Sequence, residues 1–410
     1  MKKFLLILVI AVSVAFAGFT VANMVNEQAM NKYIDSFARV EIENQLTPEL
    51  DEDGVPYFVT DGDFKVLHLT DVHICGGVLS VAEDKKAINA VAAMVTAEKP
   101  DLVIVTGDIS FAVPWAGTLN NRYAHSMFAR LMENLGVYWT VTLGNHDSEV
   151  YNLHARRAVG KMYEDESLEH CLFSRGPSDV YGECNHVINV KNSKGLITKS
   201  LIMMDSNSYT WEDPLGIFWI YDNIHADQIE WYRGVVEKYN AQNRAVYDSL
   251  SESERPTNSE DFLTVQSMLF IHIPLMEVMD AYNGYVNNNC QNSEEITYIE
   301  GEIGEESPYV YCSNDEEEMF ETMLSLGSTK AMFYGHDHLN NIVMEYKGIT
   351  LSYGYSIDYF AYADIDKKGA QRGCSIITCS PDTSFEIIHE NYYQDKYTPL
   401  YEKEEVDMTN

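Results

Sequence analysis

Five short apolar runs along the chain have the length and composition of buried strands. They cover residues 65–70, 102–106, 138–143, 267–271 and 330–334. Each run is followed at once by residue types that bind metals: Asp71-Val72-His73, Gly107-Asp108, Gly144-Asn145-His146-Asp147, His272, and Gly335-His336-Asp337-His338. Ligands of open α/β sheets bind outside the carboxyl ends of the strands. The pattern therefore predicts an α/β domain in which these five clusters converge on one rim.

Other segments extend this alternation of strands and helices. Apolar residues recur at helical spacing in residues 80–99, 121–135 and 226–240, and further strands are expected at 200–204, 342–346, 349–353, 375–378 and 385–389. We therefore place the domain at residues 64–395 and a charged, polar tail at 396–410. The irregular residues 282–315 follow His272, and two interpretations remain open: a lid over the site or a solvated loop.

The N-terminal segment indicates export. Residues 1–22 begin with two lysines, continue as an apolar stretch and pass through Ala15-Phe16-Ala17, a layout typical of a secretory signal peptide. The alternative is that residues 4–25 remain as a membrane anchor; we favour cleavage. Either way, we expect a secreted or cell-surface protein. The polar, acidic residues 23–63 are interpreted as a stalk or an irregular cover.

Charge and cysteine content narrow the function. The formal net charge of −35 repels nucleic acid, so we expect no nucleic-acid partner. It also repels a phosphate ester, so bound cations would have to reverse the local field at such a site. The seven cysteines form no Cys-x-x-Cys zinc pair. In an exported chain they suggest the disulfides Cys171–Cys184, Cys290–Cys312 and Cys374–Cys379, and Cys75 is interpreted as a small buried residue.

Carboxylate, amide and imidazole side chains are ligands for hard or borderline divalent cations. They sort into two sets: Asp71, His73, Asp108 and His338 for one ion, and Asp108, Asn145, His272 and His336 for the other. Asp108 is the expected bridge, because it is a lone carboxylate between two cation positions. Two cations about 3.5–4 Å apart can activate a bridging water as the nucleophile and clamp an in-line displacement at phosphorus.

Two residues of the third cluster are predicted to be catalytic rather than ligands. His146 is expected to assist the leaving group as a proton donor or to stabilise charge on a phosphoryl oxygen. Asp147 is expected to orient the His146 ring, with capping of a following helix as the alternative. His125, near a predicted helix start, is expected at the surface.

The ordered clusters Asp-x-His, Gly-Asp, Gly-Asn-His-Asp, His and Gly-His-x-His, from Asp71 to His338, resemble the calcineurin-like metallophosphoesterase family. This resemblance implies a four-layer α/β–β/α sandwich of two mixed sheets, a dimetal centre and hydrolysis of phosphoric esters. It also supports the two ligand sets and the role of His146.

Residues 335–341, with Lys347-Gly348-Ile349 and Tyr353-Gly354, resemble the small purple acid phosphatase branch of that family. The branch has a metal-ligand tyrosine three residues after the bridging aspartate, where this chain has Phe111. It also has Asp-x-Gly where this chain has Asp71-Val72-His73. We therefore expect a colourless protein with His73 in place of the tyrosine, and Fe, Mn or Zn as its two metals.

The predicted function is an exported dimetal hydrolase of phosphoric esters, with phosphomonoesters as small-molecule substrates. One alternative is a phosphodiesterase acting on nucleotides or lipid headgroups. Another is a catalytically inactive surface binding protein. The intact ligand set argues against the last.

Overall fold

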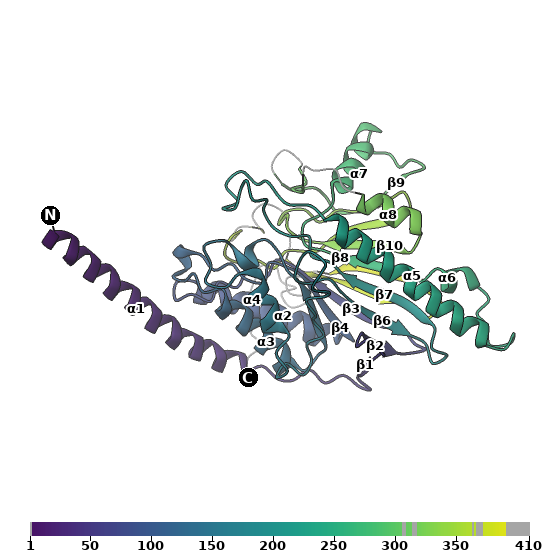
Figure 1. The fold of residues 1–410 in the computed structure, drawn as a ribbon, viewed down its shortest axis with the longest axis horizontal. Coiled ribbons are helices and arrows are strands. Elements are labelled where there is room, and N and C mark those ends of the chain that lie inside the picture. Colours follow the sequence, from purple (N-terminus) through teal and green to yellow (C-terminus); the bar gives the residue numbers. More distant parts are fainter. Residues whose placement is uncertain (1, 306–308, 314–317, 363–364, 366–371, 391–410) are drawn as a thin grey trace, which may run out of the picture.

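The computed structural model describes residues 2–305, 309–313, 318–362, 365 and 372–390. The predicted tail, 396–410, lies outside these residues, as does the end of the predicted domain. Two mixed sheets lie face to face with helices on both outer sides (Figure 1). The five-stranded sheet has the order β14-β13-β3-β4-β5, and the nine-stranded sheet has the order β1-β2-β6-β7-β8-β10-β12-β11-β9. The four-layer architecture is confirmed.

The strands of the five-stranded sheet are β3 (Phe64–Leu69), β4 (Leu102–Thr106), β5 (Trp139–Thr142), β13 (Cys374–Cys379) and β14 (Phe385–Glu390). Strands β3, β4 and β5 are parallel, and all five residues of β4 are buried. The nine-stranded sheet is formed by β1 (Glu49–Leu50), β2 (Pro56–Val59), β6 (His186–Lys191), β7 (Ile197–Met203), β8 (Ser267–Phe270), β9 (Ile296–Glu300), β10 (Thr329–Tyr334), β11 (Val343–Tyr346) and β12 (Ile349–Tyr353). Strands β7, β8, β10 and β12 are parallel at its centre.

Helices cover the outer face of each sheet. They are α1 (Lys2–Ile34), α2 (Val81–Glu98), α3 (Arg122–Leu135), α4 (Arg156–Tyr163), α5 (Ala226–Ser249), α6 (Ser259–Leu263), α7 (Met276–Asn287) and α8 (Met319–Leu326). One apolar core joins α1 to α4 to the five-stranded sheet, and another joins α5, α7 and α8 to the nine-stranded sheet. A third core lies between the sheets, where Phe64 and Ile104 meet Phe270 and Phe333.

The N-terminal part is more ordered than the sequence suggests. Helix α1 runs through the expected boundary at residue 22, and its N-terminal end projects away from the body (Figure 1). Met30 and Ile34, one helical turn apart on α1, are buried in the core, and so is Phe37 just after the helix. Strand β2 pairs with β6. Residues 23–63 therefore belong to the fold and are not a stalk. Residues 35–48 form an irregular cover over the core, whereas the flanking residues belong to α1 and to strands β1 and β2.

Within the described part of the chain, no helix combines the length and apolar character needed to cross a bilayer.

The expected disulfides are wrong, since none of the seven cysteines, all of which lie among the described residues, forms a disulfide. Cys374 and Cys379 lie at opposite ends of β13, so their Cα atoms are about 17 Å apart at the rise of a strand. A disulfide requires Cα atoms within about 7 Å. Cys75 is fully buried beside Val113 and Ala116, as expected for a small apolar residue.

Candidate metal centre

The predicted ligands lie where strands of both sheets end. Asp71, Asp108 and Asn145 follow β3, β4 and β5 of the five-stranded sheet, while His272 and His336 follow β8 and β10 of the nine-stranded sheet. All seven predicted ligands are buried. The centre is therefore built across the junction of the two sheets, at one end of the sandwich.

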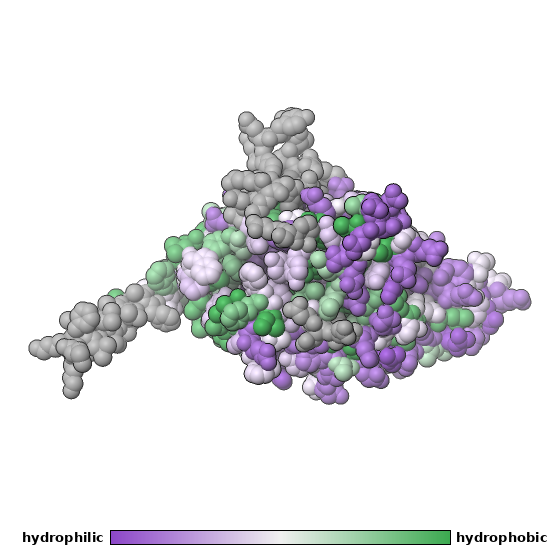
Figure 2. All heavy atoms as spheres, turned by 90° about the horizontal axis from the view of Figure 1, so that it is seen from above, coloured by the Kyte–Doolittle hydropathy of each residue, from purple (hydrophilic) through white to green (hydrophobic). Residues whose placement is uncertain are grey.

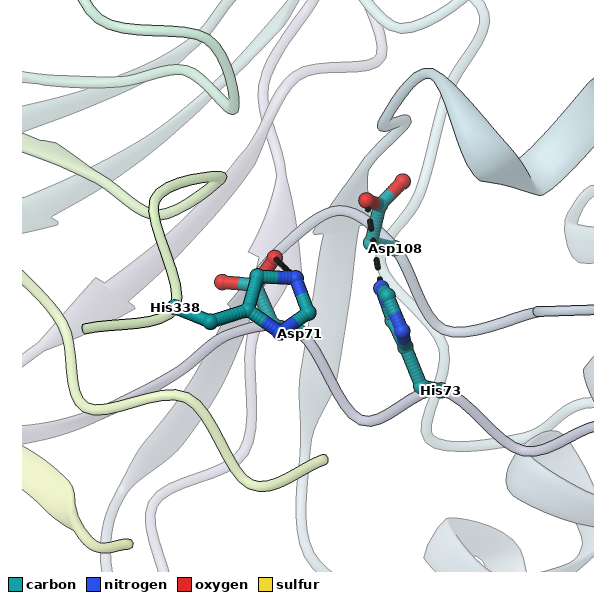
Figure 3. A group of neighbouring side chains, drawn as sticks. All are labelled: Asp71, His73, Asp108 and His338. Atoms are coloured by element: carbon teal, nitrogen blue, oxygen red, sulfur yellow. Dashed lines mark hydrogen bonds and ion pairs between the residues drawn. The ribbon is translucent and has the colours of Figure 1, made fainter. Parts of the chain in front are cut away.

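The first predicted set of ligands comes together as expected. Potential ligand atoms of Asp71, His73, Asp108 and His338 all lie within 4.8 Å of one another. Figure 3 shows the two aspartates and two imidazoles gathered around one position, with Nε2 of His338 3.6 Å from Oδ1 of Asp71. Two carboxylates and two imidazoles form a donor set suited to a borderline divalent cation.

The second set meets beside it. Asp108, His272 and His336 offer ligand atoms within 4.8 Å of one another, and the amide oxygen of Asn145 lies 3.2 Å from Nε2 of His272. The Asn145 amide nitrogen donates to the hydroxyl of Tyr209, which turns the amide oxygen toward the imidazole. All four predicted members of this set therefore lie at one position.

Asp108 joins the two sets. Its Oδ2 lies 3.3 Å from Nε2 of His73 and 3.2 Å from Nε2 of His272, one imidazole from each set. Its Oδ1 accepts the backbone N–H of His146. Burial alone would raise the pKa of Asp108, but the imidazoles of His272 and His146 outweigh burial and hold it well below its usual value. An ionised carboxylate in this position fits a bridge between two cations.

The backbone is strained at the ligands. Asp71, His73, Asp108 and His336 all have φ between +50° and +77°, a region that non-glycine residues rarely occupy. Gly335 brings two of these segments together, because a Cβ there would lie 1.9 Å from Oγ1 of Thr70 and 2.4 Å from Asp71. Strain of this kind accumulates at functional sites, and here it turns four side chains toward one point.

Hydrogen bonds fix the imidazoles. Nδ1 of His272 donates to the carbonyl of Thr106 at 2.7 Å, which leaves Nε2 for a cation. Nδ1 of His338 lies 3.1 Å from Asp358, so its Nε2 is directed toward Asp71. Such outer partners set ring orientation in metal sites. Sequence reasoning missed Asp358, which has no motif around it.

The pKa shifts of the three histidines fit a site where cations and protons compete for the imidazole nitrogens. Burial would lower the pKa of His272, but Asp108 raises it to about 9. Burial opposes and the Asp358 carboxylate favours the charged form of His338, whose pKa is also about 9. Burial holds the pKa of His336 well below its usual value, and the charge of His272 adds to this effect. Cations would therefore displace protons from His272 and His338, and the residues present fit two divalent metals.

His146 borders the centre, with its ring centroid 5.4 Å from that of His73. Its Nδ1 lies 2.7 Å from a carboxylate oxygen of Glu149. Burial would lower the pKa of His146, but the charges of Asp108 and Glu149 raise it above its usual value. A cationic imidazole whose second nitrogen is available can donate a proton or stabilise negative charge.

The expected role of Asp147 is wrong. Its carboxylate accepts backbone N–H groups from Asp108, Ser110 and Gly144, so it holds two ligand loops together and does not orient His146. The alternative of a helix cap is also not observed. Glu149 is the partner that sequence reasoning missed. Its position three residues after His146, at the end of a short 3-10 turn, is the signal that could have found it.

The structure places His125 in the interior and Phe111 against a predicted ligand. His125 is fully buried, contrary to the surface position predicted, and its ring contacts the Tyr163 hydroxyl and the Asp147 carbonyl. Phe111 stacks on His73 with a ring separation of 5.0 Å and an interplanar angle of 8°. The residue at the expected tyrosine position therefore packs against a ligand and offers no ligand atom.

Arg156 is a further residue that the motifs did not reveal. Its guanidinium donates to the carbonyls of Leu143 and Gly144 and to the carboxylate of Asp205. It therefore links the loop after β5 to the loop after β7. Burial would lower the pKa of Arg156, but the charge of Asp205 outweighs burial and raises it.

Comparison with known proteins agrees with this geometry. The family model described as calcineurin-like phosphoesterase matches residues 64–340. The chain is 24% identical to "Probable inactive purple acid phosphatase 29" of Arabidopsis thaliana, over 78% of this chain and 77% of the relative. It is 27% identical to "Probable inactive purple acid phosphatase 14" of the same plant, over 75% and 74% respectively.

Among solved structures, a dimetal phosphatase from Danio rerio aligns with a TM-score of 0.45 and 11% identity, covering 81% of this chain and all of the other. The match of the family model extends over most of the two sheets and includes every predicted ligand. The chain therefore belongs to the calcineurin-like phosphoesterase family.

Proposed function

We propose that this protein is an active, exported hydrolase of phosphoric monoesters that uses two divalent cations. The observation that carries the proposal is the pair of buried donor sets sharing Asp108. When bound, two divalent cations polarise phosphoryl oxygens and activate a water molecule as nucleophile. Fe, Mn and Zn all suit these nitrogen and oxygen donors.

The protein's own residues supply positioning and proton transfer. The Asp108 carboxylate and the imidazoles fix where the phosphoryl group binds, and burial excludes bulk water. His146, held through Nδ1 by Glu149, is the group available to protonate the leaving oxygen. Tyr209 orients the Asn145 amide. The strongly acidic chain attracts cations, whose charge in turn permits an anionic ester to approach.

Turnover of p-nitrophenyl phosphate by metal-loaded protein tests the proposal. Asp108→Asn and His336→Ala are expected to lower kcat by about a hundredfold or more, because each removes charge or a donor at the reacting centre. Asp101→Asn is a matched control, since Asp101 lies at the opposite end of β4 and binds the Lys65 backbone. His154→Ala is the control for histidine. Full activity in Asp108→Asn or His336→Ala contradicts the proposed site.

The two alternatives give different results in the same assay. Faster hydrolysis of bis-p-nitrophenyl phosphate than of the monoester indicates a phosphodiesterase. Metal binding without turnover of either ester indicates an inactive binding protein. The names of the Arabidopsis relatives, which call them probably inactive, favour the inactive binding protein. The complete donor set of this chain favours turnover.

Export is proposed from the sequence of the N-terminal segment. N-terminal sequencing of the protein recovered from culture medium and from membranes distinguishes the two forms. A mature end near residue 22 supports cleavage, and an intact Met1 in the membrane fraction supports an anchor through residues 4–25. Recovery of all the protein inside the cell contradicts export.

A further inference from the structure

A loop beside the metal centre presents apolar side chains to solvent. Residues 209–221, here called the aromatic loop, are closed at the base by a bridge between Tyr209 and Tyr221. Trp211 is 86% exposed and Phe218 is 72% exposed, and other large apolar side chains of the loop are also exposed: Leu215, Ile217 and Trp219. Contiguous exposed apolar side chains of this size mark interaction sites.

The loop is held in a defined shape. The buried carboxylate of Asp213 accepts the backbone N–H groups of Ile217, Phe218 and Ile220, and the N–H of Thr210 donates to the carbonyl of Ile220. These bonds satisfy the polar backbone inside the turn. The hydrogen-bonded turn therefore holds the apolar side chains facing solvent.

The base of the same loop touches metal ligands. Tyr209 accepts a hydrogen bond from Asn145 at 2.8 Å, and the Tyr221 ring packs edge-on against His336 with a centroid separation of 4.6 Å. The exposed tip is thus tied directly to the second donor set.

A second exposed apolar patch lies beside the first donor set. Trp115 is 64% exposed and packs against Phe111, which in turn stacks on His73. Leu153 and Phe19 of α1 line one pocket of about 260 Å³ with the residues around Trp115. Apolar side chains gather where α1 leaves the body (Figure 2).

The geometry points to a lipid surface as the partner of this rim, so that the phosphoric ester hydrolysed by the proposed activity is presented at a membrane. Two apolar, tryptophan-bearing segments bracket the metal centre. Tryptophan and tyrosine are the residues that favour the membrane–water interface. The net charge of −35 selects an uncharged, zwitterionic surface over an anionic one. This inference rests on the proposed function for its substrate, but its docking step is separable.

Tryptophan quenching by vesicles tests the docking step. Full-length, metal-loaded protein is mixed with phosphatidylcholine vesicles whose acyl chains carry bromine. Tryptophan fluorescence is expected to be quenched, and Trp211→Phe combined with Trp219→Phe should remove about half of the quenching, because phenylalanine keeps the apolar contact but not the reporter. Trp231→Phe on α5 is the matched control and should leave quenching unchanged. Anionic phosphatidylserine vesicles should give weaker quenching.

The inference is overturned if the double variant is quenched as strongly as the unchanged protein, even when the protein sediments with vesicles through α1. It is also overturned if vesicles cause no quenching, or if the double variant alters the oligomeric state in the absence of lipid, which would assign the loop to a second copy. Hydrolysis of soluble p-nitrophenyl phosphate, measured in parallel, is expected to be unchanged in the double variant. If the unchanged protein does not hydrolyse p-nitrophenyl phosphate, the proposed function is overturned. If vesicles do not quench its tryptophan fluorescence, the docking step is overturned.

Discussion

The hydrogen bonds that each side chain at the metal centre already makes determine which role it can have. The carboxylate oxygens of Asp147 accept hydrogen bonds from three backbone N–H groups. One carboxylate oxygen of Glu149 is instead hydrogen-bonded to the His146 ring. Two carboxylates two residues apart thus do different work. One holds the loops, and the other positions a proton donor.

The Glu149–His146 pair predicts a dependence on the leaving group. Glu149→Gln removes one of the two carboxylate charges that raise the pKa of His146, so kcat should fall about 10- to 100-fold for alkyl phosphates. The fall should be smaller for p-nitrophenyl phosphate, whose leaving group needs little protonation, and KM should change little. Asp147→Asn should instead lower the free energy of unfolding, by about 1–3 kcal/mol for the backbone groups it leaves unpaired. Equal losses of kcat for both substrates in Glu149→Gln would contradict a role in proton donation.

Asp358 predicts an effect on metal affinity. Its carboxylate holds Nδ1 of His338 and lies 3.7 Å from Nδ1 of His73, and the charges of His73 and His338 outweigh burial to keep its pKa well below the usual range. Asp358→Asn should weaken metal binding about 10- to 100-fold, measured by competition with a chelator.

Asp213→Asn is the matched control for Asp358, because both carboxylates accept several backbone N–H groups, but Asp213 contacts no ligand side chain. An equal loss of affinity in Asp213→Asn would show that loop order, and not ring orientation, explains the effect.

At the scale of elements, each strand of the centre ends in a ligand, and the loops that follow connect the sheets. The Asp71 carboxylate accepts the backbone N–H of His336, and this bond joins the end of β3 to the end of β10. Ser206, after β7, accepts the N–H groups of His272 and Ile273 after β8. The ligands are therefore positioned by bonds between elements that are far apart in the sequence.

Strand β7 carries a buried lysine that predicts a pH effect on stability. Lys199 is fully buried and donates to the carbonyl of Thr383 and to Gln266, and burial lowers its pKa from 10.5 to about 8. Between these values the unfolded chain binds the proton and the folded chain does not, so stability should rise with pH. The gain relative to Lys199→Met should approach about 3 kcal/mol as the pH rises from about 8 to 10.5.

Urea unfolding of both proteins across this pH range measures the Lys199 effect. Groups that titrate in both proteins, such as tyrosines, cancel in the difference. Parallel curves for the two proteins would mean that Lys199 keeps its ordinary pKa in the fold.

At the scale of the whole molecule, the centre joins two sheets that otherwise meet through an apolar core. The donor sets draw on loops after β3, β4 and β5 of one sheet and β8 and β10 of the other. Cations that bind this junction bind the folded state and not the unfolded chain. The metals should therefore act as a clamp between the sheets.

Removing the metals should reveal how much they stabilise the fold. Ions present at about one hundred times their Kd should add about 2.7 kcal/mol to the free energy of unfolding, so a chelator should lower Tm by several degrees. Added Mn²⁺ or Zn²⁺ should restore Tm, and neither should change the Tm of Asp108→Asn to the same extent. A Tm that ignores chelator and metals would contradict a cation site between the sheets.

Much of the fold and most of the donor set could be predicted because their signals are local. Strands β8 and β10 coincide with two of the predicted apolar runs, and His272 and His336 each lie two residues after the end of their strand. The same locality explains the failures. Glu149, Asp358 and Arg156 stand outside the motifs, and His125 and the cysteines were placed by neighbours in the sequence instead of neighbours in space.

The sequence by itself determined which chemistry the chain carries: the apolar periodicity defines the strands, and the residue after each strand defines a potential ligand. Tertiary structure alone decided that ligands from two different sheets share Asp108, that Glu149 and not Asp147 holds His146, and that exposed aromatic side chains flank the centre. The physical reason is range. Periodicity and strand-end position are properties of a few consecutive residues, whereas hydrogen-bond partners and burial depend on which distant segments the packed sheets bring together.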